Sequence, residues 1–317
     1  MYQFFVEEQQ ISGTQIRVSG PDAHHMLHVL RLKPGEEVSV RVLMPVSEAY
    51  RDAELRCAFQ GEGPQEADGS PSAMLSLLFI KQDNVELPAT VILYQAIPKA
   101  DKMEFIVQKA VELGAVRIVP VITKRCVSDW TGKEAKKRQR LQGIAEAAAK
   151  QAKRGIVPAV LMPKGFADAM REAAAAGRVL VPYELVQPMH QTASAQQIAA
   201  AQGQAAAQSI EALKLTPAAQ QSTDPQPPAE SQETAEAQPI AAQPSSSPMD
   251  RTREIFSSIR PGDTVSFFIG PEGGFTEEEI AIAGENGAEC ITLGRRILRT
   301  ETAGLYVLSV LGYLLEQ

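Results

Sequence analysis

Alternating strand-like and helix-like segments constrain this chain more than any other feature of its sequence. From Ala89 onward, the nearly continuous apolar run TVILYQAI is typical of a strand buried on both faces, and the amphipathic segment DKMEFIVQKAVELG after it is typical of a surface helix. Asp101 is placed to cap this helix and Gly114 to end it. The order repeats through VRIVPVIT, RVLVPYEL, TVSFFIG and ECITLG, with helical segments between them except after RVLVPYEL, where a polar stretch follows. Such alternation predicts an α/β fold with a parallel sheet.

The first 88 residues follow a different pattern. Short strand-like runs, FFV, QIRVS and EEVSVRVL, surround one helix-like piece, DAHHMLHVLRL, and a Pro34–Gly35 turn precedes the last strand. This pattern predicts a small β-rich domain over residues 1–88, followed by the α/β domain over residues 89–317.

Residues 187–250 differ in composition from the rest of the second domain. They consist largely of Ala, Gln, Ser, Pro and Thr and contain no aromatic residue. A segment of this composition buries too little apolar surface to offset the entropy lost on ordering. We therefore interpret residues 187–250 as a low-complexity, disordered insertion in a loop that follows a strand, where chains tolerate additions.

Cysteine content and hydropathy restrict the class of protein. The three cysteines of this 317-residue chain, Cys57, Cys126 and Cys290, are far apart and form no CxxC pair, which argues against a disulfide framework and a zinc site. No apolar run is long enough to span a membrane, and the N-terminal MYQFFVEEQQ lacks the basic and apolar regions of a signal peptide. We expect a reduced cytoplasmic enzyme with no metal and no membrane partner.

Charge is distributed unevenly along the chain, whose formal net charge is −7. Residues 99–154 contain fourteen Lys and Arg against six Asp and Glu, a local balance of +8. Residues 187–250 contain one Lys against six acids, a balance of −5. The overall acidity therefore belongs partly to the insertion, and the basic segment of the folded part is compatible with an RNA surface.

Two glycine-bearing loops follow consecutive strands near the C-terminus. The first, GPEGG at 270–274, precedes a helix that opens at Thr276 with three glutamates in its first turn. Glycines let backbone groups approach a ligand closely, and ligands of parallel sheets bind outside the carboxyl ends of the strands. Because three glutamates at a helix start disfavour a pyrophosphate, we expect a neutral or cationic ligand held by backbone polar groups.

The second loop, LGRRILRTETAG at 293–304, carries three arginines and follows the first with a single helix between them. That spacing makes the two loops neighbours at one edge of the sheet, where together they could enclose one ligand. The alternative is a solvated turn with a surface pair between Arg299 and Glu301.

These residues resemble the RsmE family of 16S ribosomal RNA uridine N3-methyltransferases, in the SPOUT superfamily. GPEGGFTEEEI followed by LGRRILRTETA is very similar to that family, and KADKMEFIVQKAVELGAVRIVPV resembles the first segment of its catalytic domain. RLQGIAEAAAKQAKRGIVPAV resembles a family helix, and FFV with HHMLHVLRLKPGEEV resembles its PUA-like RNA-binding domain. Only the polar stretches 61–72 and 187–250 lie outside the match.

The resemblance implies a fold and a cofactor that alternation alone does not suggest. It implies a SPOUT-type parallel sheet with a deep C-terminal trefoil knot, a small N-terminal PUA-like β-barrel, S-adenosylmethionine bound in the knot, and homodimers with sites at the interface. Carried over by position, the cofactor contacts would be Leu185, Gly270, Pro271, Glu272, Gly273, Leu293, Gly294, Ile297, Leu298, Thr302 and Ala303.

The implied reaction also assigns roles to charged residues. N3 of uracil bears a proton, so methylation there needs stabilisation of charge on the ring and a proton acceptor. We expect Arg299 to contact a uracil oxygen or a phosphate, and Glu272 and Glu301 to accept the proton or to orient Arg299, with a structural salt bridge as the alternative for Glu301. Candidate RNA phosphate contacts, each of which could instead be a solvated charge, are Arg31, Lys99, Lys102, Arg125 and Arg154.

Two other functions remain open from the sequence. A related methyltransferase acting on another ribosomal or transfer RNA position would carry the same knot motifs. A non-catalytic RNA-binding assembly factor is the other alternative, and the intact GPEGG and RILRTETA motifs argue against it. Metal binding is not expected for His24, His25 and His28, and for His25 and His28 we expect RNA contact or packing instead.

Overall fold

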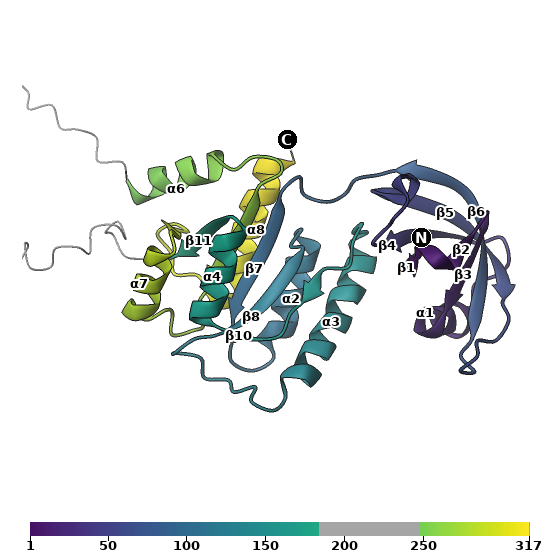
Figure 1. Ribbon diagram of the computed structural model, residues 1–317, viewed down its shortest axis with the longest axis horizontal. Coiled ribbons are helices and arrows are strands. Elements are labelled where there is room, and N and C mark those ends of the chain that lie inside the picture. The colour runs from purple at the N-terminus through teal and green to yellow at the C-terminus, as the bar shows by residue number, and fades with distance from the viewer. Residues whose placement is uncertain (184–246, 317) are drawn as a thin grey trace, which may run out of the picture. The chain divides into compact units, whose positions relative to one another are not determined.

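A computed structural model of the chain describes residues 1–183 and 247–316 (Figure 1). Most of the insertion predicted at 187–250, together with the predicted cofactor contact Leu185, lies outside the described residues. Its last residues are described, and Pro248–Asp250 form the first turn of helix α6 (Pro248–Ser257). The compositional boundary falls inside this helix because the apolar residues that anchor it, Ile255 and Phe256, come only in its second half.

The N-terminal sheet has six strands in the order β1-β4-β5-β6-β3-β2. β1 (Gln3–Glu7) runs parallel to β4 (Glu37–Leu43), and the other neighbours are antiparallel. The remaining strands are β2 (Ile11–Ser12), β3 (Gln15–Ser19), β5 (Ala53–Glu62) and β6 (Ser72–Gln82). The sheet curls around an apolar cluster that includes Phe4, Leu55 and Phe59 (Figure 1). The predicted β-rich N-terminal unit is therefore confirmed as a curled sheet.

A helical segment joins β3 to β4. α1 (Gly20–His24) begins at Gly20, whose φ of +66° favours glycine, and continues directly into a π-helical turn (His25–Val29). Met26 is buried against the curled sheet, whereas the rings of His24 and His28 are exposed, with their centroids 4.7 Å apart. Short 3-10 turns at Glu8–Gln10 and Glu48–Tyr50 complete this unit.

The second sheet is entirely parallel, with β7 (Thr90–Ala96) and β12 (Thr264–Ile269) side by side at its centre. The order is β10-β8-β7-β12-β11-β13, and β9 pairs with β8. The other strands are β8 (Arg117–Ile122), β9 (Ala159–Val160), β10 (Lys164–Gly165), β11 (Arg178–Pro182) and β13 (Glu289–Ile291). The predicted parallel α/β fold is confirmed.

Helices cover both faces of the parallel sheet, because the central strands are apolar on both. α2 (Lys102–Glu112), α3 (Glu134–Gln151) and α8 (Thr300–Leu315) share one core with alternate strand residues such as Leu93 and Phe267. On the other face, Phe166 of α4 (Phe166–Ala176) packs edge-on against Phe268, which stacks on Tyr94 at 4.5 Å. α7 (Glu277–Glu285) lies beside α4.

The parallel order brings several loops to one edge of the sheet. β7, β11, β12 and β13 are neighbours that run in the same direction, so the segments following all four leave from their carboxyl ends. In open α/β sheets this edge is where ligands bind. Both glycine-bearing loops of the sequence start here.

Candidate functional site

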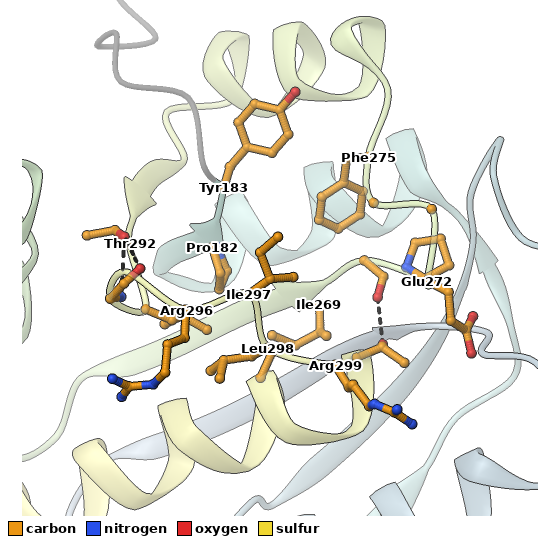
Figure 2. Close-up of a pocket in the computed structure, with 18 of the residues that line it drawn as sticks. Pro182, Tyr183, Ile269, Glu272, Phe275, Thr292, Arg296, Ile297, Leu298 and Arg299 are labelled. Carbon is orange, nitrogen blue, oxygen red and sulfur yellow. Dashed lines mark hydrogen bonds between the residues drawn. The ribbon is translucent and has the colours of Figure 1, made fainter.

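A pocket of about 660 Å³ opens at the carboxyl edge of the parallel sheet (Figure 2). Its lining comes from residues 269–275 after β12, from most of residues 292–300 between β13 and α8, and from Pro182 and Tyr183 at the end of β11. Lys102 and Ala303 complete it. The two loops predicted to be neighbours thus form two walls of one pocket.

The loop after β12 is compact because its glycines allow the backbone to fold back on itself. A Cβ added to Gly270 would lie 3.3 Å from Gly274 Cα and 3.5 Å from the Phe275 ring, and Gly274 has a φ of +67°. Side chains at either position would therefore strain or widen the turn.

Side chains from neighbouring elements hold this loop in place. Arg125 Nη1 donates to the carbonyl oxygens of Gly273 at 2.8 Å and Phe275 at 3.1 Å. Thr276 and Glu279 form a capping box at the start of α7, and the buried Glu279 carboxylate also accepts from the Lys124 backbone N–H at 2.8 Å. The loop is tied on both sides to the turn after β8.

The second loop lines the pocket with apolar side chains and two cations. Ile297 is 85% exposed and lies between Pro182 and Phe275 in Figure 2. The side chains of Arg296 and Arg299 are exposed and extend in different directions from the loop (Figure 2). Such an exposed isoleucine in a pocket wall is a surface that a bound ligand would cover.

A buried hydrogen-bond chain joins the two loops to the central strand. Gln95, at the end of β7, donates from Nε2 to Thr300 Oγ1 at 3.0 Å, and the Thr300 hydroxyl donates to the Gly270 carbonyl oxygen at 2.7 Å. Gln95 is fully buried and Thr300 nearly so. This contact fixes the start of α8 against the start of the glycine loop.

Lys102, Glu272 and Glu301 form a charged cluster at one side of the pocket. Lys102 Nζ lies 2.9 Å from Glu272 Oε1 and 3.2 Å from Glu301 Oε2. Hydrogen bonds to Glu272 and Glu301 raise the pKa of Lys102. Partial burial raises the pKa of each glutamate, but hydrogen bonds from Lys102 and backbone amides outweigh it, so the pKa of Glu272 and the pKa of Glu301 lie below their ordinary value.

These lowered values bear on the proton acceptor. A general base is most effective when its pKa lies near the working pH, and a strongly paired carboxylate is a weaker acceptor. The cluster therefore favours a role for Glu272 and Glu301 in orienting Arg299, or a structural salt bridge for Glu301, over a role as the general base.

Most of the predicted cofactor contacts are brought together here. Thr302 is exposed on α8 and is not part of the lining, and Leu185 is not among the described residues. Of the predicted catalytic residues, Arg299 and Glu272 line the pocket, and Glu301 adjoins it through Lys102. The contacts found in the lining are Gly270, Pro271, Glu272, Gly273, Leu293, Gly294, Ile297, Leu298 and Ala303.

The predicted RNA contacts are more dispersed. Arg31, with a φ of +53°, and Lys99 are exposed, whereas Lys102 and Arg125 bond to the pocket loops. Arg154 differs from the expectation, because it is 3% exposed. Its guanidinium pairs with Glu86 and donates to the carbonyl oxygens of Val111, Gly114 and Ala115, so all three of its nitrogens donate within the protein.

Several pocket residues were not identified from the sequence. Thr300 and Arg296 lie in the same stretch of sequence as Arg299. Phe275 directly follows the first glycine loop, and Tyr183 directly follows strand β11. Gln95 carried the clearest signal, because it is a polar residue in an otherwise apolar strand. A buried glutamine needs hydrogen-bond partners, but the sequence does not say which.

The pocket suits a small ligand that is neutral or cationic where it meets the first loop. Its volume is within the range of small-molecule sites, and its walls combine apolar side chains with backbone groups of glycine loops. Glu272 and the acidic first turn of α7 disfavour an anion near the first loop. A ligand with an apolar part and a positive charge, such as S-adenosylmethionine, fits these residues.

Two other properties of the described residues complete the description of the site. Within residues 1–183 and 247–316, no three His, Cys, Asp or Glu side chains are grouped so that they could hold a metal ion. The helices described in those ranges include none long and apolar enough to cross a membrane.

Comparison with known proteins places the chain among RNA-modifying enzymes. A family model described as an RNA methyltransferase domain matches residues 85–210 and 185–312. Ribosomal RNA small subunit methyltransferase E of Bacillus subtilis is 28% identical over 100% of this chain and 98% of its own length, and that of Mycobacterium bovis is 24% identical over 98% and 91%. The crystal structure of ribosomal RNA small subunit methyltransferase E from Neisseria gonorrhoeae, bound to S-adenosyl methionine, is similar with a TM-score of 0.65 and 25% identity, covering 99% of this chain and 98% of that one.

Proposed function

The chain belongs to the RNA methyltransferase family, and on that basis we propose that it transfers a methyl group from S-adenosylmethionine to N3 of a specific uridine in the 16S ribosomal RNA of the small ribosomal subunit. The observation that carries the proposal is the convergence of the two glycine-bearing loops on one pocket. The similarity to small-subunit methyltransferases along the whole chain supports the ribosomal substrate.

The pocket loops would hold the cofactor largely through backbone groups. The glycine loop 270–274 and the turn around Gly294 offer amides and carbonyls, and Ile297 and Leu298 offer apolar contacts. When bound, S-adenosylmethionine supplies a methyl group on a positively charged sulfur. Leu185 and Thr302 remain proposed contacts, from the same resemblance.

Arg299 is the residue proposed to act on the uracil. It is exposed at the pocket, where its guanidinium can hydrogen bond to a uracil oxygen and stabilise negative charge that develops as N3 loses its proton. Glu272 and Glu301 are proposed to hold Lys102 and the two loops in position. Alignment of the reacting atoms would then supply a large part of the rate.

The RNA surface is proposed to extend from the pocket to the curled N-terminal sheet. Lys99 near the pocket and Arg31 in the N-terminal unit each present an exposed cation to RNA phosphates. Lys102 and Arg125 already bond to the pocket loops. We propose that each contacts RNA only through the part of its side chain that these bonds leave accessible. The curled sheet is proposed to be a PUA-like domain.

We further propose that the loop after β13 is part of a C-terminal trefoil knot. Support comes from α8, which begins against the loop after β12 and packs on α2, and from β11, which lies between β12 and β13 although it precedes both. In such a knot, the last segment would thread past earlier loops.

A homodimer is proposed from the exposed side of α8. Its exposed positions include Thr302, Tyr306 and Ser309, which share one helical face that starts beside Glu301, and Phe105 on the adjacent α2 is 47% exposed. Exposed aromatic residues beside a pocket are typical of an interface that completes a site.

The same proposal includes the domain boundaries and the cellular location. Residues 1–88 would form one domain and 89–317 the other, with 187–250 as an insertion. Most buried residues of the N-terminal sheet form a cluster of their own, although Phe5 packs in the cluster of the parallel sheet. The location would be the cytoplasm, where ribosomal RNA is found. A methyltransferase for another ribosomal or transfer RNA position, and a silent assembly factor, remain the competing functions.

Mass mapping of 16S ribosomal RNA tests the proposal. RNA from cells that lack the gene should have lost one N3-methyluridine, and purified protein with labelled S-adenosylmethionine should restore it. If every uridine modification persisted and no label entered, the substrate would be wrong. Calorimetry with S-adenosylmethionine would then distinguish an enzyme with another target from an RNA binder.

A further inference from the structure

We propose that Thr300 and Gln95 are positioning residues for the cofactor pocket. Their buried hydrogen-bond chain holds the loop after β12 and the start of α8 in the arrangement that binds the methyl donor. This inference rests on the proposed function, and it assigns a role to two buried residues that carry no charge.

The hydrogen-bond chain has only one consistent direction. Gln95 Nε2 lies 2.9 Å from the Ala96 carbonyl oxygen, which can only accept, so the amide nitrogen must face it. The second N–H of this amide then points to Thr300 Oγ1 at 3.0 Å. Thr300 therefore accepts from Gln95, and its single hydroxyl proton remains for the Gly270 carbonyl oxygen at 2.7 Å.

This chain connects three segments that are distant in sequence. Gln95 is the last residue but one of the central strand β7, Gly270 begins the glycine loop, and Thr300 is the first residue of α8. Gln95 and Thr300 are separated by 205 residues. Since Gln95 is 0% and Thr300 7% exposed, water cannot replace the contacts at low cost.

Loss of the Thr300 hydroxyl would leave two buried groups without partners. These groups are the Gly270 carbonyl and one Gln95 N–H. Because a buried polar group without a partner is costly, conformations of the glycine loop in which each group bonds to water or to another partner would become more populated. The fraction of molecules with a competent pocket falls, and the apparent cofactor affinity falls by the same fraction. Saturating cofactor restores the competent form, so the KM for S-adenosylmethionine should rise while kcat changes little.

Three variants separate this role from a general effect on folding. Thr300→Val removes the hydroxyl at nearly constant shape, Thr300→Ser keeps it, and Gln95→Met removes the donor. Thr90→Val is the matched control, because Thr90 is an exposed threonine at the opposite end of β7. Circular dichroism checks that each variant is folded.

The first readout is amide hydrogen exchange in the cofactor-free protein. In Thr300→Val and Gln95→Met, the amides of Gly274 and Ala303, which donate to Pro271 and Arg299 in the wild type, should exchange at least about tenfold faster. Thr300→Ser and Thr90→Val should stay within about twofold of wild type. Unchanged exchange in Thr300→Val would overturn the proposal.

The second readout is cofactor binding. Calorimetry and steady-state kinetics should give a Kd and a KM for S-adenosylmethionine about tenfold higher in Thr300→Val, with kcat within about twofold. A lower kcat with an unchanged KM, or equal damage in Thr300→Ser, would overturn the positioning role. If the wild type itself bound no S-adenosylmethionine while exchange in Thr300→Val accelerated, the proposed function would fail, and the failure would be separate from that of the hydrogen-bond chain.

Discussion

At the scale of single residues, the cations around the pocket differ in whether the protein already uses their donors. Arg125 donates to the glycine loop and Lys102 pairs with two carboxylates. Arg299 is exposed beside the same pocket. Cations whose donors the protein does not already use, Arg299 among them, are best placed to meet an incoming uracil oxygen.

Arg299→Ala should therefore lower kcat by roughly a hundredfold, the usual effect of removing a donor that stabilises developing charge. The Kd for S-adenosylmethionine should change by less than about twofold, because the proposed cofactor contacts are backbone groups and other side chains. Arg295→Ala is the matched control, since Arg295 is an exposed neighbour outside the pocket lining. Equal activity in both variants would remove Arg299 from the chemistry.

The charged cluster predicts a defined dependence on pH. The pKa of Glu272 and the pKa of Glu301 are lowered from 4.5 in the folded protein, so their contribution to stability is present above pH 4.5 and is lost as the pH falls below it. The pKa of Lys102 is raised from 10.5, so its contribution is complete below that value and is lost above it. Between these limits the cluster stays fully charged.

Thermal melts of wild type and Lys102→Met over pH 3 to 9 test this account. The difference in Tm between the two proteins should be constant from about pH 5.5 to 9 and should shrink below about pH 4.5. A difference that changes near pH 7 would mean that another group titrates in contact with Lys102.

At the scale of elements, two glycines in similar open surroundings should respond in opposite ways to substitution by alanine. Gly143 lies in the middle of α3 and Gly287 follows α7, and an added Cβ at either position meets no atom within 4 Å. Gly287 has a φ of +75°, whereas Gly143 has a helical backbone. Comparing alanine substitutions at the two positions therefore separates the effect of backbone conformation on stability from the effect of packing.

Gly143→Ala should raise the free energy of unfolding by about 0.5–1 kcal/mol, because alanine loses less entropy in a helix. Gly287→Ala should lower it by about 1 kcal/mol, because the left-handed region is unfavourable for a residue with a Cβ. Denaturant titration of the two variants measures both values. Destabilisation by Gly143→Ala would show that α3 has a partner at this position.

The element scale also shows what the sequence could and could not predict. The strands β7, β8, β11 and β12 follow the apolar runs because burial on both faces imposes that composition, and the short edge strand β13 also falls within a predicted run. α6 was not predicted, since its anchoring residues Ile255 and Phe256 follow a polar, proline-containing stretch. The contact of Gln95 with Thr300 depends on tertiary packing, so no local pattern encodes it.

At the scale of the whole molecule, the exposed side of α8 predicts how copies of the chain associate. Tyr306 is 41% exposed and lies one turn beyond Thr302, close to the pocket end of the helix. A charge at the centre of a dimer interface would be left desolvated and unpaired.

Tyr306→Glu should therefore convert a dimer into a monomer in sedimentation velocity and lower methyltransferase activity at least about tenfold. Tyr306→Phe should remain dimeric, because it keeps the apolar ring. A Tyr306→Glu protein that still sediments as a dimer would place the interface on another surface.

The order of strands in the parallel sheet has a consequence for the protein's synthesis. β12 lies between β7 and β11 but is made after both of them. At 5–20 residues per second, roughly 9–35 s separate the emergence of β7 from that of β12. Once β11 has also emerged, the nascent chain carries two apolar strand edges with no partner at the centre of the sheet until β12 follows, and such edges invite pairing with other chains. The nascent enzyme is thus vulnerable to aggregation during synthesis, because the strand that carries the glycine loop is the last to enter the middle of the sheet. The same central position supports the pocket in the folded protein.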